Sequence, residues 1–198
     1  MSDAAHTGRI GPNAVIRLAE ALDALESKAV TKKLFIAAKL ETYVHALPET
    51  MVPEEEVTVL HRHLRSDLGA GRAASVSWIA GQRTADYLLA NRIPKPVQRL
   101  LKVLPARLAA FILLKAIGAH AWTFAGTSRF SWKMGRPITL TFEDCPLCRW
   151  DKASDPCCSY YSATFERLFR KLINPDTNVR ETDCIATGSE ACRFEIRY

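Results

Sequence analysis

Four short stretches near the C-terminus decide the fold: Cys145-Pro-Leu-Cys148, Asp155-Pro-Cys157-Cys158, Glu181-Thr-Asp-Cys184 and Cys192-Arg-Phe-Glu195. They contain all six cysteines of the 198-residue chain, and the first 144 residues contain none. The thiols therefore belong to one local construction. In a cytosolic protein, where thiols stay reduced, such a grouping favours a metal site over disulfides.

The local sequence predicts how three of these cysteines meet. Asp155-Pro156 is typical of a helix start and places Cys158 in the first turn, where backbone N–H groups favour a thiolate. Two strands are expected around a turn centred on Gly188, which sets Cys184 opposite Cys192. We therefore expect Cys158, Cys184 and Cys192 to share one zinc ion.

The residues leave the fourth zinc ligand open. Glu181 lies three positions before Cys184, so in a regular strand it faces the other way, and only a bulge or an irregular strand start would turn it toward the metal. Cys157, Cys148 and Cys145 are the alternatives. A closed, thiolate-rich site is structural, because it keeps no open position for a catalytic water.

Hydrophobic periodicity predicts an α+β fold of one domain. Residues 1–10 are expected to be a disordered tail, residues 11–121 a helical part, and residues 122–198 a four-stranded antiparallel sheet with helices packed on one face. The sheet part has the order strand, strand, helix, strand, strand. Helices are expected near residues 11–25, 31–45, 54–68, 73–89, 94–104, 105–121 and 156–173, and strands over 124–134, 136–142, 179–186 and 191–198.

Positive charge is concentrated in the middle of the chain. The net charge is +6, and residues 87–142 contain no acidic residue. Arg92, Lys95, Arg99 and Lys102 recur at helical spacing and form a basic stripe. A basic amphipathic helix suits an anionic lipid surface, so residues 92–107 are a candidate for peripheral contact with the inner membrane.

Other classes of partner and location are less favoured. No apolar run of 18 residues exists, and the polar N-terminal residues do not look like a signal peptide, so we expect a cytoplasmic protein. No nucleic-acid motif is present. His45, His61 and His63 are expected to be surface or half-buried residues.

One stretch resembles a cofactor motif. Gly69-Ala-Gly71-Arg-Ala-Ala74 matches a loose dinucleotide pattern, but a helical stretch precedes it where a strand is required, so it is interpreted as a helix–helix turn. The sequence therefore shows no nicotinamide or flavin site.

The cysteine motifs resemble a known family. Cys158, Glu181-x-x-Cys184 and Cys192-Arg-Phe are similar to the signature of the 4-vinyl-reductase domain, and the whole chain resembles members of that family from bacteriochlorophyll biosynthesis. The resemblance implies a structural zinc at Cys158, Glu181, Cys184 and Cys192. It also implies a Mg-porphyrin ligand.

These expectations define three hypotheses for function. The first is a homodimeric carrier that holds a Mg-porphyrin and presents it to the enzymes of bacteriochlorophyll synthesis. The second is an 8-vinyl (4-vinyl) reductase of divinyl protochlorophyllide, and the third is a ligand-sensing or assembly domain. A flat macrocycle requires an aromatic slot, a cation and an axial donor, which predicts a site at His120, Trp122, Phe124 and Arg129.

Overall fold

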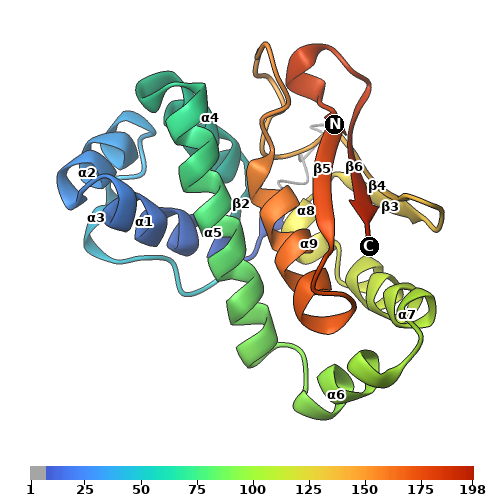
Figure 1. Ribbon diagram of the computed structural model, residues 1–198. Helices are drawn as coiled ribbons and strands as arrows, with labels where there is room; N and C mark the ends of the chain where they lie inside the picture. The colour runs from blue at the N-terminus through green and yellow to red at the C-terminus, as the bar shows by residue number, and fades with distance from the viewer. Residues whose placement is uncertain (1–7) are drawn as a thin grey trace, which may run out of the picture.

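The computed structural model describes residues 8–198, in which a helical half joins a sheet half (Figure 1). Residues 1–7 of the expected tail lie outside this range, whereas Arg9 and Ile10 pair with a second short strand. The elements are β1 Arg9–Ile10, α1 Asn13–Leu25, α2 Lys28–Ala37, α3 Thr42–His45, β2 Val52–Pro53, α4 Glu54–Leu68, α5 Ala70–Asn91, α6 Lys95–Val103, α7 Ala106–Ala119, α8 Trp122–Ala125, β3 Arg129–Lys133, β4 Ile138–Glu143, α9 Ser159–Leu172, β5 Asn178–Asp183 and β6 Ala191–Arg197.

The four-stranded sheet confirms the predicted α+β class. It is antiparallel with strand order β3-β4-β6-β5, and α9 connects its two hairpins. Side chains alternate between buried and partly exposed along β4 and β6, so one face packs on the helices and the other faces outward. Figure 1 shows α9 beside the sheet, with α5 next to it.

Helices α5 and α9 cross closely at a glycine. A Cβ on Gly81 would lie 2.2 Å from the carbonyl oxygen of Tyr160, so only glycine permits this approach. The hydroxyl of Thr164 donates to the Gly81 carbonyl at 3.1 Å, and the hydroxyls of Thr84 and Tyr160 are 2.7 Å apart. These contacts fix the helical half against the sheet half.

Two predicted helices have different bounds. The expected helix over 31–45 is split into α2 and α3, because Lys39 adopts a positive φ of 59° that ends the first helix. Gly69, with φ of 78°, separates α4 from α5, so a helix–helix turn lies there as predicted, but it is shorter than expected, because residues 70–74 already belong to α5.

Two predictions near the site were wrong in detail. Residues 122–125 form the short helix α8, because the N–H groups of Thr123 and Phe124 bond back to His120 and Ala121, and the strand begins only at Arg129. Helix α9 begins at Ser159, after both cysteines, because the backbone of Cys158 is not helical, with φ of −95° and ψ of 42°, and Cys158 is the N-cap.

The basic stripe lies on an outlying part of the fold. Arg92, Lys95, Arg99 and Lys102 are exposed, and Figure 1 shows α6 at the edge of the molecule. Its apolar side is only partly covered: Leu101 is buried, whereas Leu100 and Val103 are 51% and 79% exposed.

Across residues 8–198, no helix has the length and apolar character needed to cross a membrane.

Candidate functional site

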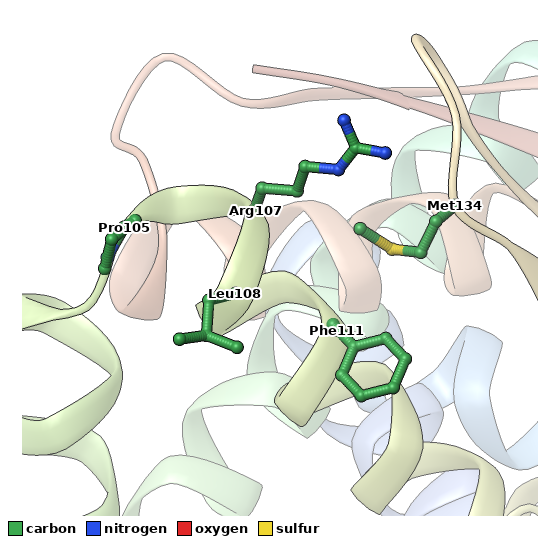
Figure 2. Close-up of a pocket in the computed structure, with 5 residues that line it drawn as sticks. All are labelled: Pro105, Arg107, Leu108, Phe111 and Met134. Carbon is green, nitrogen blue, oxygen red and sulfur yellow. The ribbon is translucent and has the colours of Figure 1, made fainter.

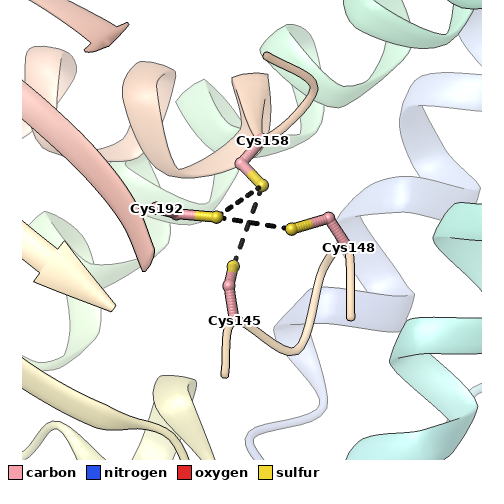
Figure 3. Close-up of side chains that lie close together, drawn as sticks. All are labelled: Cys145, Cys148, Cys158 and Cys192. Carbon is pink, nitrogen blue, oxygen red and sulfur yellow. Dashed lines mark hydrogen bonds between the residues drawn. The ribbon is translucent and has the colours of Figure 1, made fainter. Parts of the chain in front are cut away.

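The six cysteine sulfurs form one continuous cluster at the end of the sheet. Cys148 Sγ lies 3.3 Å from Cys192 and 3.8 Å from Cys184, and Cys158 Sγ lies 3.7 Å from Cys145. Figure 3 shows four of these side chains pointing toward one another from a loop, the start of α9 and strand β6. Segments almost fifty residues apart therefore contribute to a single centre.

A tight turn presents the first pair of thiols. In the loop after β4, the N–H groups of Cys148 and Arg149 donate to the Cys145 carbonyl at 3.2 and 2.9 Å. This turn brings both sulfurs to the same side of the loop, and both residues are fully buried. The Cys145-Pro-Leu-Cys148 turn thus places its two thiols together in the cluster.

The closing hairpin has an irregularity at the predicted position. The pairing of β5 with β6 shifts between Glu181 and Asp183, which is a bulge or a related irregularity. Strand β5 ends at Asp183, and residues 185–187 turn as a short 3₁₀ helix, so Cys184 follows the strand and is not part of it. The irregularity lets Glu181 and Cys184 approach the same centre.

Glu181 has the environment of a metal ligand. Its Oε2 accepts the Cys158 N–H at 2.7 Å, while Oε1 is buried and has no hydrogen-bond partner among the described residues. Burial, reinforced by the neighbouring Cys184, raises the pKa of this carboxyl to about 9. A buried carboxylate with a free oxygen needs a cation or a proton.

Three overlapping sets of four ligands have all ligand atoms within 4.8 Å of one another. One is the set expected from the sequence, Cys158, Glu181, Cys184 and Cys192. The alternatives Cys145, Cys148 and Cys157 lie in the other two: Cys145, Cys148, Cys158 and Cys192; and Cys148, Cys157, Cys158 and Cys184. The donors are soft thiolates with one carboxylate, so the residues fit a zinc ion.

Polar groups around the cluster stabilise negative charge. Ile185 N–H approaches Cys192 Sγ at 3.4 Å. Burial disfavours the charged form of Arg65, but Cys157 and Asp151 outweigh burial and raise its pKa. Sequence reasoning missed Arg65, because it lies on α4, about eighty residues before the first cysteine.

A large cavity lies between the helical half and the sheet half. Its volume is about 1410 Å³, and helices α1, α5, α7 and α9 contribute to its wall. The lining is mainly apolar and includes Leu88, Ile112, Tyr161 and Phe165. This volume exceeds the roughly 300–1,000 Å³ typical of pockets for drug-sized ligands.

The cavity brings together most of the predicted ligand-binding residues. His120, Trp122 and Phe124 line it, whereas the exposed Arg129 is not in the lining and lies 3.3 Å from Glu143. The cations at the cavity are Arg17 and Arg92. Arg92 was part of the basic stripe, but nothing in the sequence linked Arg17 to it.

The His120 ring has a defined orientation. Its Nδ1 lies 2.9 Å from the Ala116 carbonyl oxygen. Because a carbonyl only accepts, Nδ1 donates in this contact. The contact orients an exposed ring at the C-terminal end of α7.

Of the other histidines, His61 was predicted wrongly. It is fully buried on α4 with its ring edge-to-face with Tyr160 at 5.9 Å. Burial, with a smaller effect from Arg65, lowers its pKa to about 3, so it is neutral.

A second hollow, of about 550 Å³, lies at the start of α7. Figure 2 shows Pro105, Arg107, Leu108 and Phe111 of this segment with Met134. Leu108 and Phe111 are partly exposed.

Comparison with known proteins identifies the family to which the chain belongs. The profile of the 4-vinyl-reductase domain matches residues 138–198, which hold all six cysteines. The chain is 42% identical to the bacteriochlorophyll synthase 23 kDa chain of Cereibacter sphaeroides, over 95% of this chain and 90% of that protein. The chain belongs to the family of the bacteriochlorophyll synthase 23 kDa chain. The family member from Rhodobacter capsulatus is 38% identical, over 95% of this chain and 86% of its own length.

Solved structures of H-NOX proteins share the fold. A mutant H-NOX protein from K. algicida, in its Fe(II) unliganded state, superposes with a TM-score of 0.59 at 10% identity, over 95% of this chain and 96% of its own. The protein from S. oneidensis in its Fe(II)NO ligation state gives 0.59 at 11% identity, over 95% and 98%. The likeness covers both halves of the 23 kDa-chain family fold.

Proposed function

We propose that the protein binds a Mg-porphyrin intermediate of bacteriochlorophyll synthesis in the large cavity and presents it to enzymes of that pathway. The pathway follows from the family, whose relatives are named for bacteriochlorophyll synthase. The observation that carries the ligand is a cavity of about 1410 Å³ lined by His120, Trp122 and Phe124.

The chemistry of the cavity suits a tetrapyrrole. Its aromatic and aliphatic lining matches the apolar macrocycle, and Arg92 offers positive charge to a carboxylate at the macrocycle edge, whereas Arg17 already pairs with Glu20 at 2.6 Å. One H-NOX structure with this fold was determined to study heme distortion, so another family with this fold holds a porphyrin. This supports the proposal without assigning the residues.

A zinc ion at Cys158, Glu181, Cys184 and Cys192 has a structural role in this proposal. It would tie the start of α9 to the β5–β6 hairpin, and α9 forms part of the cavity wall. The zinc lies in a closed set of four ligands, so it supplies rigidity and no reaction step.

Absorption titration distinguishes the carrier hypothesis from the reductase hypothesis. Purified protein is titrated with Mg-protoporphyrin monomethyl ester and with divinyl protochlorophyllide, each with and without NADPH. Saturable binding with unchanged pigment is the expected result. Conversion to the ethyl product would establish the reductase, and absence of binding to both pigments would contradict the proposal.

Replacing His120 with Ala is expected to weaken pigment binding about tenfold and to shift the bound absorption bands, because the axial donor is lost. His63→Ala is the matched control, because this half-buried histidine lies on α4 and outside the cavity lining. Equal affinity and identical spectra for both variants would remove His120 from the site.

Reversing charge on α6 is expected to abolish attachment to lipid. Arg99→Glu with Lys102→Glu should lower binding to vesicles containing anionic lipid about a thousandfold, since each charge contributes about 1 kcal/mol and the two reversals together change the charge by about four units. Lys32→Glu with Lys33→Glu makes the same charge change on exposed positions of α2. Co-sedimentation that is equal for the two double variants would contradict contact through α6.

A further inference from the structure

We propose that the cysteine cluster holds a second divalent metal ion, bound by Cys145 and Cys148 together with Cys158 and Cys192, which it shares with the first. The inference builds on the zinc site of the proposed function and extends it. It concerns the two thiols that a single ion at Cys158, Glu181, Cys184 and Cys192 leaves unused.

The four sulfurs lie close enough together to share one ion. Cys148 also lies 3.8 Å from Cys184 of the first site, so these two sulfurs must move apart when both ions bind. With metal–sulfur bonds of about 2.3 Å, two thiolates on one zinc ion are separated by about 3.8 Å. The observed separations are 3.7 Å for Cys145 to Cys158, 3.3 Å for Cys148 to Cys192 and 3.9 Å for Cys158 to Cys192. All four Sγ atoms lie within 4.8 Å of one another (Figure 3).

The two ligand sets have one edge in common. Cys158 and Cys192 belong both to the set with Cys145 and Cys148 and to the set with Glu181 and Cys184. Two tetrahedra that share these sulfurs give a centre with two bridging thiolates. Each ion then has four ligands, and no further donor is required.

The charge of the second ion is compensated locally. Cys145 and Cys148 are fully buried, and their deprotonation would be costly without a cation. A divalent ion that binds both thiolates releases two protons to solvent, so the net charge of the buried cluster stays the same. The Cys145-Pro-Leu-Cys148 turn already holds the two donors together, which lowers the entropy cost of binding.

Cys157 provides an internal control. It is half-buried, and its sulfur lies 3.8 Å from Cys184 but belongs to neither set of the proposed pair. It does belong to the third set, with Cys148, Cys158 and Cys184. Replacing Cys157 therefore distinguishes the proposed arrangement from one that uses all six thiols.

The test is the metal content of the full-length protein, purified under reducing conditions with excess zinc and measured by native mass spectrometry. We expect two zinc ions per chain in the wild type and in Cys157→Ser, and one in Cys145→Ser and Cys148→Ser. One ion per chain in the wild type, or two in the Cys145 variant, would overturn the second site. No zinc at all would instead overturn the first site as well.

Cobalt substitution tests the bridge without any variant that has to fold. The apoprotein is titrated with Co²⁺ and followed by absorption and electron paramagnetic resonance. The first equivalent should give a thiolate-to-cobalt absorption band and a paramagnetic resonance signal of the intensity expected for one isolated Co²⁺ ion. The second equivalent should lower the signal intensity per cobalt, because shared thiolates couple the spins of the two ions. A signal that grows in proportion through two equivalents would overturn the bridging arrangement.

Discussion

Removing the metal from the cysteine cluster is expected to unfold the sheet half of the protein. Structural zinc binding contributes an apparent free energy of about 10–16 kcal/mol, which equals or exceeds the roughly 5–15 kcal/mol stability of a whole domain. Three segments meet at this cluster: the loop after β4, the start of α9 and the β5–β6 hairpin. Without the ion, the buried thiols and Glu181 would be protonated, and the metal–ligand bonds that tie the three segments together would be lost.

The measurement is thermal unfolding followed by circular dichroism, with a strong chelator and then with zinc restored. Cys192→Ser should reproduce the chelated state even with zinc present, because this ligand is fully buried on a central strand. Cys157→Ser should unfold within about 1 kcal/mol of the wild type. An unchanged melting curve after verified metal removal would contradict a structural role.

Replacing Glu54 with Ala is expected to destabilise the protein by about 3 kcal/mol, since it removes the buried carboxylate partner of the Arg149 guanidinium and leaves only the exposed Asp144 carboxylate at 3.4 Å. Glu54 is buried at the start of α4, accepts the Thr127 N–H at 2.8 Å and lies 2.9 Å from Arg149 Nη1. It thereby joins the helical half to the β3 side of the sheet. Arg149 directly follows Cys148, so the pair also supports the cysteine loop.

Chemical denaturation measures this loss, with Glu41→Ala as the control at an exposed glutamate on the same half. Burial opposes ionisation of Glu54, but the hydrogen bonds from Thr127 and Arg149 lower its pKa below the usual range. Its contribution is therefore present at neutral pH and is lost as the pH falls through the folded-state pKa. Equal denaturation midpoints for the two variants would show that the pair contributes nothing.

The sequence predicted the gathering of the cysteines better than the cavity, for a physical reason. The cysteines lie in local units, a Cys-x-x-Cys turn and a short hairpin, whose geometry follows from spacing. In a regular strand Glu181 and Cys184 would face opposite sides of the sheet. Their meeting at one site therefore required the irregular pairing that is seen between Glu181 and Asp183. The spacing of the cysteines in the sequence did not show how many ions the cluster could hold, because three ligand sets overlap in space.

The cavity depends on contacts between distant segments. Arg17 and Arg92 line the same space from α1 and from the end of α5, and no local pattern links them. The α5–α9 crossing at Gly81, which sets the distance between the cavity walls, is equally invisible in the sequence. The burial of His61 has the same origin, because a residue on a polar-looking helix is covered by Tyr160 from α9.

Blocking the cavity tests the account most directly. Ile112 lines the cavity on α7, and Ile79 is a similarly half-buried isoleucine on α5 outside the lining. Mg-protoporphyrin monomethyl ester is titrated into the wild type, Ile112→Trp and Ile79→Trp, with binding followed by absorption. One pigment per chain, bound at least tenfold more weakly by Ile112→Trp alone, is the predicted result. Unchanged affinity in Ile112→Trp, or the same loss in both variants, would contradict pigment binding in this cavity.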